Sequence, residues 1–204
     1  MCQAAHMLSK VMHHRANKRA SQDVESLLPE AQALHAALSA LHFSIKEYIS
    51  NGSSSDVTNK SSIVALTLCS SAQLLLYNLY GCNEPLVLAE QSRIAMETEM
   101  QSASLNGIKS ISFTVMPAIA RANIDCPLIA QCLYHAATEC AWFIREDHEP
   151  QMYSALEDIL KELKSIGENW QIATEYLSLL QQAGVLNLMS YDTDASNTLT
   201  PSSG

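Results

Sequence analysis

Residues 27–48, with the sequence LLPEAQALHAALSALHFSIKEY, carry the clearest periodicity in the chain. Their apolar residues follow one another at alternating spacings of four and three, which places them along one face of an α-helix. These residues are Leu27, Ala31, Leu34, Leu38, Leu41, Ile45 and Tyr48. The same stripe fits a coiled-coil seam, but the small side chains that flank it favour a helix packed in a bundle.

The segments on either side of this helix predict further helices. We expect them at residues 2–14, 62–80, 85–106, 108–120, 126–146, 150–165 and 168–182. Short polar side chains, glycines and prolines mark their ends, because these residues cap or interrupt helices. The predicted markers are Ser21 or Asp23, a loop at 50–60, Ser61 or Ser62, Gly81, Pro85, Asn106-Gly107, a kink at Pro117, Asp125 with Pro127, and Gly167.

Three of these helices have predicted buried faces. Residues 62–80 are apolar nearly all round, which is typical of the central helix of a bundle. In 126–146 the expected inner residues are Leu128 or Ile129, Cys132, Leu133, Ala136, Cys140 and Phe143. In the last helix they are Trp170, Ala173, Leu177 and Leu180.

Composition supports the same fold class. Of 204 residues, 48% are hydrophobic and 16% charged, which suits a chain with a sizeable core. Six glycines and six prolines are too few for a loop-rich β-sandwich or barrel. We therefore predict an all-α bundle of about seven or eight antiparallel helices. We expect one helical domain at 1–186, followed by a disordered polar tail at 187–204.

Charge and cysteine content limit the functions of this chain. The net charge of −9 argues against direct nucleic-acid binding, which depends on Lys and Arg. The basic start, His13-His14-Arg15 with Lys18 and Arg19, is either a nuclear localisation patch or a plain loop between helices. The six cysteines lie in apolar runs, which suits reduced and buried thiols. Neither a secretory signal nor an uninterrupted apolar stretch long enough for a membrane span is present.

Motifs for catalysis or metal binding are absent from the sequence. It contains no phosphate-binding glycine loop, zinc-protease motif or serine-hydrolase elbow. Cys132 and His135 lie one helical turn apart, but a zinc site needs two more ligands. His13 and His14 point apart, and His35 and His42 lie too far apart to share a metal. We therefore predict no enzyme, no catalytic or metal-binding residue and no cofactor.

Three segments, taken in order, resemble a known family. They are Ser71-Ala-Gln-Leu-Leu-Leu-Tyr-Asn-Leu-Tyr-Gly-Cys82, Cys126-Pro-Leu-Ile-Ala-Gln-Cys-Leu-Tyr-His-Ala-Ala137 and Trp170-Gln-Ile-Ala-Thr-Glu-Tyr-Leu177. Together with residues 91–94 and the opening helix, they resemble the C-terminal part of the regulatory domain of fungal zinc-cluster transcription factors. The resemblance spans about residues 1–182 and lacks the six-cysteine zinc cluster that binds DNA in that family.

The resemblance implies a function in transcription. It implies a non-catalytic domain, in the nucleus, that modulates transcription through protein partners, self-association or a small effector. Direct DNA contact and zinc are not carried over, because the cluster is missing. The matching residues Leu74–Leu76, Tyr77, Leu133, Tyr134 and Trp170 are expected in the core. The alternative is a free-standing, cytoplasmic small-molecule-binding protein or enzyme of secondary metabolism.

Overall fold

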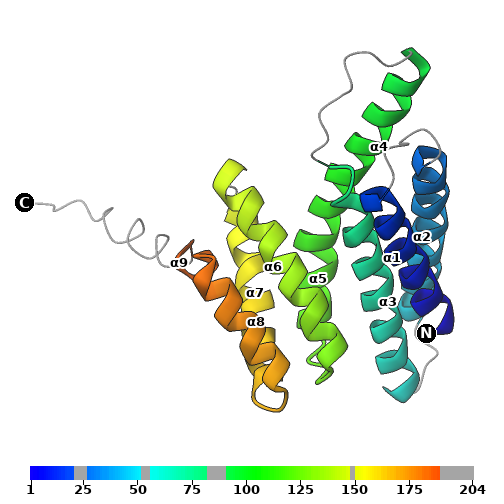
Figure 1. Cartoon of the computed structure of the whole chain (residues 1–204). Coiled ribbons are helices and arrows are strands. Elements are labelled where there is room, and N and C mark those ends of the chain that lie inside the picture. The colour runs from blue at the N-terminus through cyan, green and yellow to red at the C-terminus, as the bar shows by residue number, and fades with distance from the viewer. Residues whose placement is uncertain (21–26, 52–55, 82–90, 148–149, 189–204) are drawn as a thin grey trace, which may run out of the picture. The chain divides into compact units, whose positions relative to one another are not determined.

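The computed structural model describes residues 1–20, 27–51, 56–81, 91–147 and 150–188 (Figure 1). All regular elements in these ranges are helices, which confirms the all-α prediction. Seven of them have twelve residues or more and two have five or fewer, besides one π-helical turn. The chain, for which we expected one domain over 1–186, forms two compact units, Met1–Ile111 and Ser112–Gly204.

The first unit contains four long helices. They are α1 (Cys2–Ala20), α2 (Leu27–Ser50), α3 (Asp56–Tyr77) and α4 (Gln91–Ser110). Helix α3 packs against each of the other three, and it buries residues on most of its sides from Ala65 onward. The prediction that this apolar segment forms a central helix is therefore confirmed for the first unit.

The apolar stripe of α2 is buried over only half of its length. Leu27, Ala31, Leu34 and Leu38 are buried. Further along, Leu41 and Ile45 are half-buried and Tyr48 is 53% exposed. The second half of α2 therefore leaves part of its inner face open to solvent.

Three predicted boundaries of the first unit are wrong. Helix α1 continues past residue 14 to Ala20, so the basic segment that we considered as a loop between helices is helical. Helix α3 begins at Asp56, inside the segment predicted as a loop and before Ser61. Helix α4 continues through Asn106-Gly107 to Ser110. Gly107 does not break the helix, and its missing side chain makes room for Tyr77. A Cβ at Gly107 would lie 2.3 Å from Cε2 of that ring.

The second unit begins with an irregular helical segment. A π-helical turn η1 (Ile111–Val115) follows α4 directly and leads into the short α5 (Met116–Ala120). Pro117 lies in the first turn of α5, where its missing N–H breaks no helical hydrogen bond. The π-helical turn ends two residues before the proline, so the helix is irregular beside the position where we predicted a kink.

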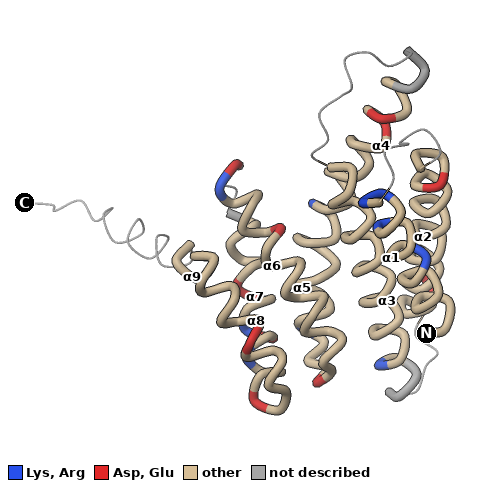
Figure 2. Tube along the Cα trace, viewed as in Figure 1, with Lys and Arg blue, Asp and Glu red and all other residues tan. Residues whose placement is uncertain are grey.

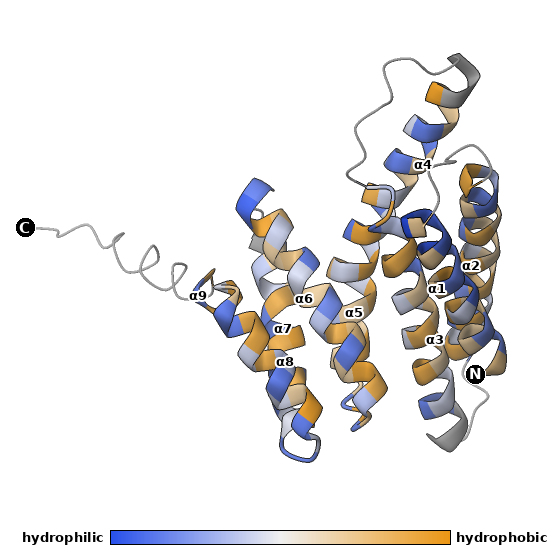
Figure 3. Ribbon diagram, viewed as in Figure 1, coloured by the Kyte–Doolittle hydropathy of each residue, from blue (hydrophilic) through white to orange (hydrophobic). Residues whose placement is uncertain are grey.

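The remaining helices form the core of the second unit. They are α6 (Pro127–Asp147), α7 (Pro150–Gly167), α8 (Gln171–Gln182) and α9 (Val185–Leu188). Helix α7 packs against α5, α6 and α8. Asp125, predicted to cap α6, accepts a hydrogen bond from Asn169 Nδ2 at 2.9 Å. Figure 3 shows α8 with both apolar and polar positions, as expected of a helix that buries one face.

The predicted inner faces of α6 and α8 are confirmed with one exception. Helix α6 buries Ile129 rather than Leu128, together with Cys132, Leu133, Ala136, Cys140 and Phe143. Helix α8 buries Ala173 and Leu180, and Leu177 is half-buried. Trp170 is 43% exposed, so its prediction as a core residue is wrong. Its extended backbone lies at the N-cap of α8, and the residue therefore falls outside the helical periodicity.

Several predictions concern residues outside the described ranges. They are the cap at Ser21 or Asp23, Pro85 with the start of the fourth helix, and the part of the predicted tail from residue 189 onward. The predicted start of the tail at residue 187 is wrong, because Asn187 and Leu188 belong to α9. Within the described ranges, no helix combines the length with the apolarity that crossing a bilayer requires.

Candidate functional site

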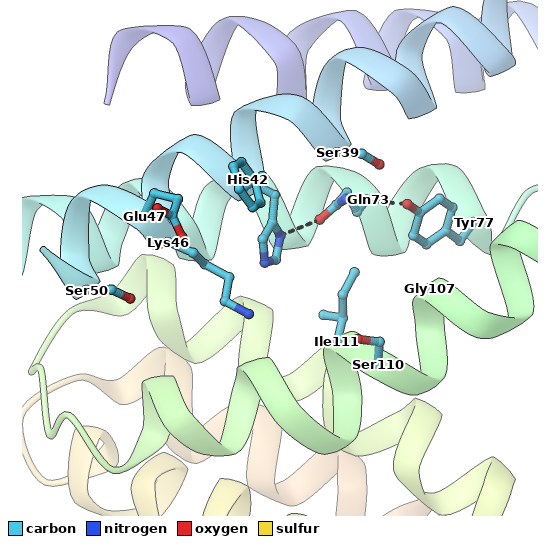
Figure 4. Close-up of a pocket in the computed structure, with 11 residues that line it drawn as sticks. Ser39, His42, Lys46, Glu47, Ser50, Gln73, Tyr77, Gly107, Ser110 and Ile111 are labelled. Atoms are coloured by element: carbon cyan, nitrogen blue, oxygen red, sulfur yellow. Dashed lines mark hydrogen bonds between the residues drawn. The ribbon is translucent and has the colours of Figure 1, made fainter.

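A groove of about 390 Å³ lies in the first unit between α2, α3 and the end of α4 (Figure 4). Helix α2 provides one wall and α3 the polar floor, while the chain from Gly107 to Ile111 provides the facing wall. The lining residues are Ser39, His42, Phe43, Lys46, Glu47, Ser50, Gln73, Tyr77, Gly107, Ser110 and Ile111. A volume of this size accommodates a small organic molecule.

Helical periodicity brings the polar side chains of the groove together. His42 and Lys46 lie four residues apart on α2, so their side chains are neighbours on one face. Gln73 and Tyr77 have the same spacing on α3. Figure 4 shows His42 and Lys46 extending from α2 toward α4. The open second half of α2 is therefore the part of the helix that lines the groove.

A chain of hydrogen bonds fixes the groove floor. His42 Nδ1 donates to Gln73 Oε1 at 2.8 Å, since an amide oxygen only accepts. Gln73 Nε2 donates to the Tyr77 hydroxyl at 3.3 Å. The same hydroxyl is hydrogen-bonded to His35 Nδ1 at 3.0 Å. With its proton on Nδ1, the neutral His42 ring presents Nε2 as a hydrogen-bond acceptor.

The groove floor is uncharged and its rim is charged. Burial lowers the pKa of His42, the bond to Gln73 partly offsets this, and the positive charge of Lys46 lowers the pKa further. Burial raises the pKa of Tyr77. Beyond Lys60, α3 carries no charged residue up to its end (Figure 2). The charges that line the groove, Lys46 and Glu47, therefore both come from α2, where they are exposed.

A second polar cluster joins α1, α2 and the turn after α3. His14 is fully buried, with Nδ1 2.7 Å from Glu30 Oε2 and Nε2 2.7 Å from the Tyr80 hydroxyl. Lys18 lies 3.7 Å above the Tyr80 ring and donates to the carbonyl of Leu79. From the sequence we considered His14 as a metal ligand beside His13 and as part of the basic start, but we did not identify these partners.

The His14 cluster has the order of a catalytic relay without an accessible nucleophile. The relay of serine hydrolases also aligns a carboxylate, an imidazole and a hydroxyl. Here the hydroxyl belongs to Tyr80, which is 4% exposed. Burial, with the charge of Glu30, raises the pKa of Tyr80 to about 12. The cluster is therefore suited to joining helices rather than to attacking a substrate.

The cysteine and histidine residues considered for metal binding do not form a cluster. In the described part of the chain, no three His, Cys, Asp or Glu side chains are placed to hold a metal ion. Cys132 is buried and His135 half-buried on α6. Burial raises the pKa of Cys69 to about 12, and it also raises the pKa of Cys140. These two thiols are therefore protonated at neutral pH.

The residues that carry the family resemblance mostly lie in the core. Leu74, Leu76, Tyr77 and Leu133 are buried, whereas Leu75 and Tyr134 are half-buried. Tyr77 also forms part of the groove floor, which the sequence did not indicate. Comparisons with family models, with curated proteins and with solved structures find no match for this chain.

Proposed function

We propose that this chain is a non-catalytic regulatory domain of a fungal zinc-cluster type of transcription factor. In this proposal a small effector binds in the groove between α2, α3 and α4 and changes the contacts that the domain makes with protein partners or with a second copy. The observation that carries the proposal is the groove itself. Its neutral polar floor is held by His42, Gln73 and Tyr77, and an exposed Lys46 lies on its rim.

The chemistry of this groove favours binding over catalysis. Tyr77 stays protonated because its pKa is raised, and its hydroxyl already bonds to Gln73 and His35. The Nδ1 atom of His42 is engaged with Gln73. None of the residues that line the groove is a cysteine. A preformed set of hydrogen-bonding groups beside an open space is typical of a ligand site.

The charge of the chain supports the assignment of DNA contact to another part of the factor. A net charge of −9 opposes binding to a polyanion. The nuclear location and the transcriptional function rest on the resemblance. The groove supplies the place where an effector would bind.

A fusion experiment tests the proposal. The chain is joined to a heterologous DNA-binding domain and expressed in a fungal host with a reporter gene. We expect reporter transcription to differ from that of the DNA-binding domain alone, and to change again with His42→Leu. Lys10→Ala, an exposed position on α1, is the matched control and should behave as the unaltered fusion. Transcription identical to that of the DNA-binding domain alone would contradict the proposal.

The alternative function is that of a free-standing small-molecule-binding protein, and the same groove favours it. The two proposals differ in DNA binding. A form of the chain extended upstream through its gene should bind DNA at low salt if the chain belongs to a transcription factor. Failure of both the extended and the original form to bind DNA would favour the free-standing binder.

A further inference from the structure

We infer that the groove binds a small hydroxylated aromatic carboxylate, with the carboxylate on Lys46, the hydroxyl donating to His42 Nε2 and the ring against Phe43 and Ile111. The inference rests on the proposed function, because it names the chemical class of the effector for that groove. Each of the three contacts follows from a separate feature of the groove.

The hydroxyl contact follows from the fixed orientation of His42. Its Nδ1 proton is committed to Gln73 Oε1 at 2.8 Å, and the Gln73 amide is held in turn by Tyr77. The other ring nitrogen, Nε2, therefore faces the groove as an acceptor (Figure 4). A phenolic hydroxyl is a suitable donor to such a nitrogen.

The carboxylate contact follows from Lys46. Lys46 lies one helical turn from His42 on the same face of α2, and both side chains line the groove. Among the described residues, no carboxylate forms an ion pair with Lys46. A ligand carboxylate would supply that partner, and a charge-assisted hydrogen bond is stronger than a neutral one.

The aromatic character of the proposed ligand follows from the apolar residues in the walls of the groove. Phe43, one residue from His42, is 65% exposed at the groove, and Ile111 lies on the facing wall. An aromatic ligand would cover Phe43 and gain the offset or edge-to-face contact that ring pairs prefer. The volume of about 390 Å³ suits a single substituted ring.

The same residues disfavour other classes of ligand. A phosphate or other dianion would meet a single cation, with Glu47 beside it on α2. A purely apolar ligand would cover the Nε2 acceptor of His42 without giving it a partner, which costs binding energy. A metal ion would find one imidazole, one carboxylate and a repelling ammonium group.

The test is titration of the whole purified chain with the three hydroxybenzoate isomers, followed by amide NMR and calorimetry. We expect saturable binding of at least one isomer, with shifts concentrated at 39–50 and 73–77. Benzoate, which lacks the hydroxyl, and the matching hydroxybenzyl alcohol, which lacks the carboxylate, should each bind about tenfold more weakly. Absence of saturable binding, or shifts elsewhere in the chain, would overturn the inference.

Two variants assign the contacts to their residues. Lys46→Met should remove the preference for the acid over the alcohol, and His42→Leu should remove the preference for hydroxybenzoate over benzoate. Lys10→Met, on α1, is the matched control and should keep both preferences. The circular dichroism spectrum of each variant checks that it folds. Retention of both preferences in the two groove variants would overturn the inference.

The inference and the proposed function fail in different ways. Saturable hydroxybenzoate binding with no response in the reporter fusion would overturn the proposed function and leave the ligand class standing. A reporter response that depends on His42, together with no hydroxybenzoate binding, would overturn the ligand class alone.

Discussion

The two units of the molecule join their helices by different means. In Met1–Ile111, polar side chains bridge the helices, as in the His14–Glu30–Tyr80 cluster and in the bond from His42 to Gln73. In the second unit the centre is aliphatic. Its largest fully buried side chains include Leu133, Ile144, Leu156, Ile159 and Leu163.

Among the described residues, most side-chain hydrogen bonds that join segments of the second unit lie near its surface, although the buried Cys140 thiol donates to the carbonyl of Ser112. Examples near the surface are Arg121 with Asp158, and Asn169 with Asp125. The comparison suggests that the second unit gains its stability mainly from apolar burial, which is not directional. The first unit uses directional contacts, and such contacts leave fixed polar groups at an open face where a ligand can be recognised.

We expect the largest loss of stability from a substitution that removes buried hydrocarbon from the second unit. Leu156→Ala, on α7, should lower the free energy of unfolding by about 2–5 kcal/mol, because it removes packed atoms and leaves a cavity. Tryptophan fluorescence follows this unit alone, since both tryptophans, Trp142 and Trp170, lie in it. Leu179→Ala, at a position 46% exposed, is the control and should cost far less. Equal losses would refute the apolar account of this unit.

We expect the next largest loss of stability from removing a buried hydrogen bond that joins segments of the first unit. His14→Leu should cost about 1–3 kcal/mol, because the buried hydroxyl of Tyr80 loses its partner. Amide hydrogen exchange in α1 to α3 measures the change. Adding Tyr80→Phe should restore part of the stability, since both partners are then apolar. His13→Leu, at the exposed neighbouring position, is the matched control. A double variant less stable than His14→Leu alone would contradict the account.

A smaller effect is expected where α3 and α4 approach most closely. The Cβ added by Gly107→Ala would meet the Tyr77 ring. Overpacking costs about 1–3 kcal/mol, and alanine returns up to about 1 kcal/mol of helix propensity. The net loss should therefore be about 1–2 kcal/mol by the same amide-exchange measurement. Gly167→Ala, whose Cβ would lie 3.1 Å from Thr174 Oγ1, provides the comparison in the second unit and should change stability by less than about 1 kcal/mol.

We expect the smallest effect on stability from removing a buried charge in the second unit, whose centre is otherwise aliphatic. Burial, with the charge of Asp125, raises the pKa of Glu162 on α7. A raised pKa means that the fold disfavours the carboxylate, so this cost is absent in acid and grows as the pH rises. Glu162→Gln should therefore raise the melting temperature at pH 7 and leave it nearly unchanged near about pH 4. Glu157→Gln, exposed on the same helix, should show no such trend. A gain that is equal at both pH values would refute the assignment.

Local patterns predict the helices of this chain well. The spacing of apolar residues located α2, α6 and α8, because burial on one face of a helix leaves a visible period. The same reasoning failed at Gly107. There the ring of Tyr77, thirty residues earlier in the chain, leaves no room for a side chain at position 107. The reasoning also failed at Trp170, which lies just outside a helix whose period it happens to match.

The candidate groove was beyond prediction for a related reason. On sequence alone we considered His35 and His42 only as metal ligands, because their hydrogen-bond partners are distant in sequence. His42 bonds to a residue 31 positions away and His35 to one 42 positions away. Periodicity along one helix holds no information on which residues of another helix face it. A groove formed by three helices therefore requires their packing to be known.

The close contact between Gly107 and Tyr77 has a consequence for the evolution of this chain. Because a side chain at 107 would overlap the ring at 77, the two positions cannot change independently. Descendants of a common ancestor that keep a tyrosine at 77 should also keep a glycine at 107. Those that acquire a side chain at 107 should carry a smaller residue at 77. This paired inheritance offers a means of recognising distant relatives in which the rest of α3 and α4 has diverged.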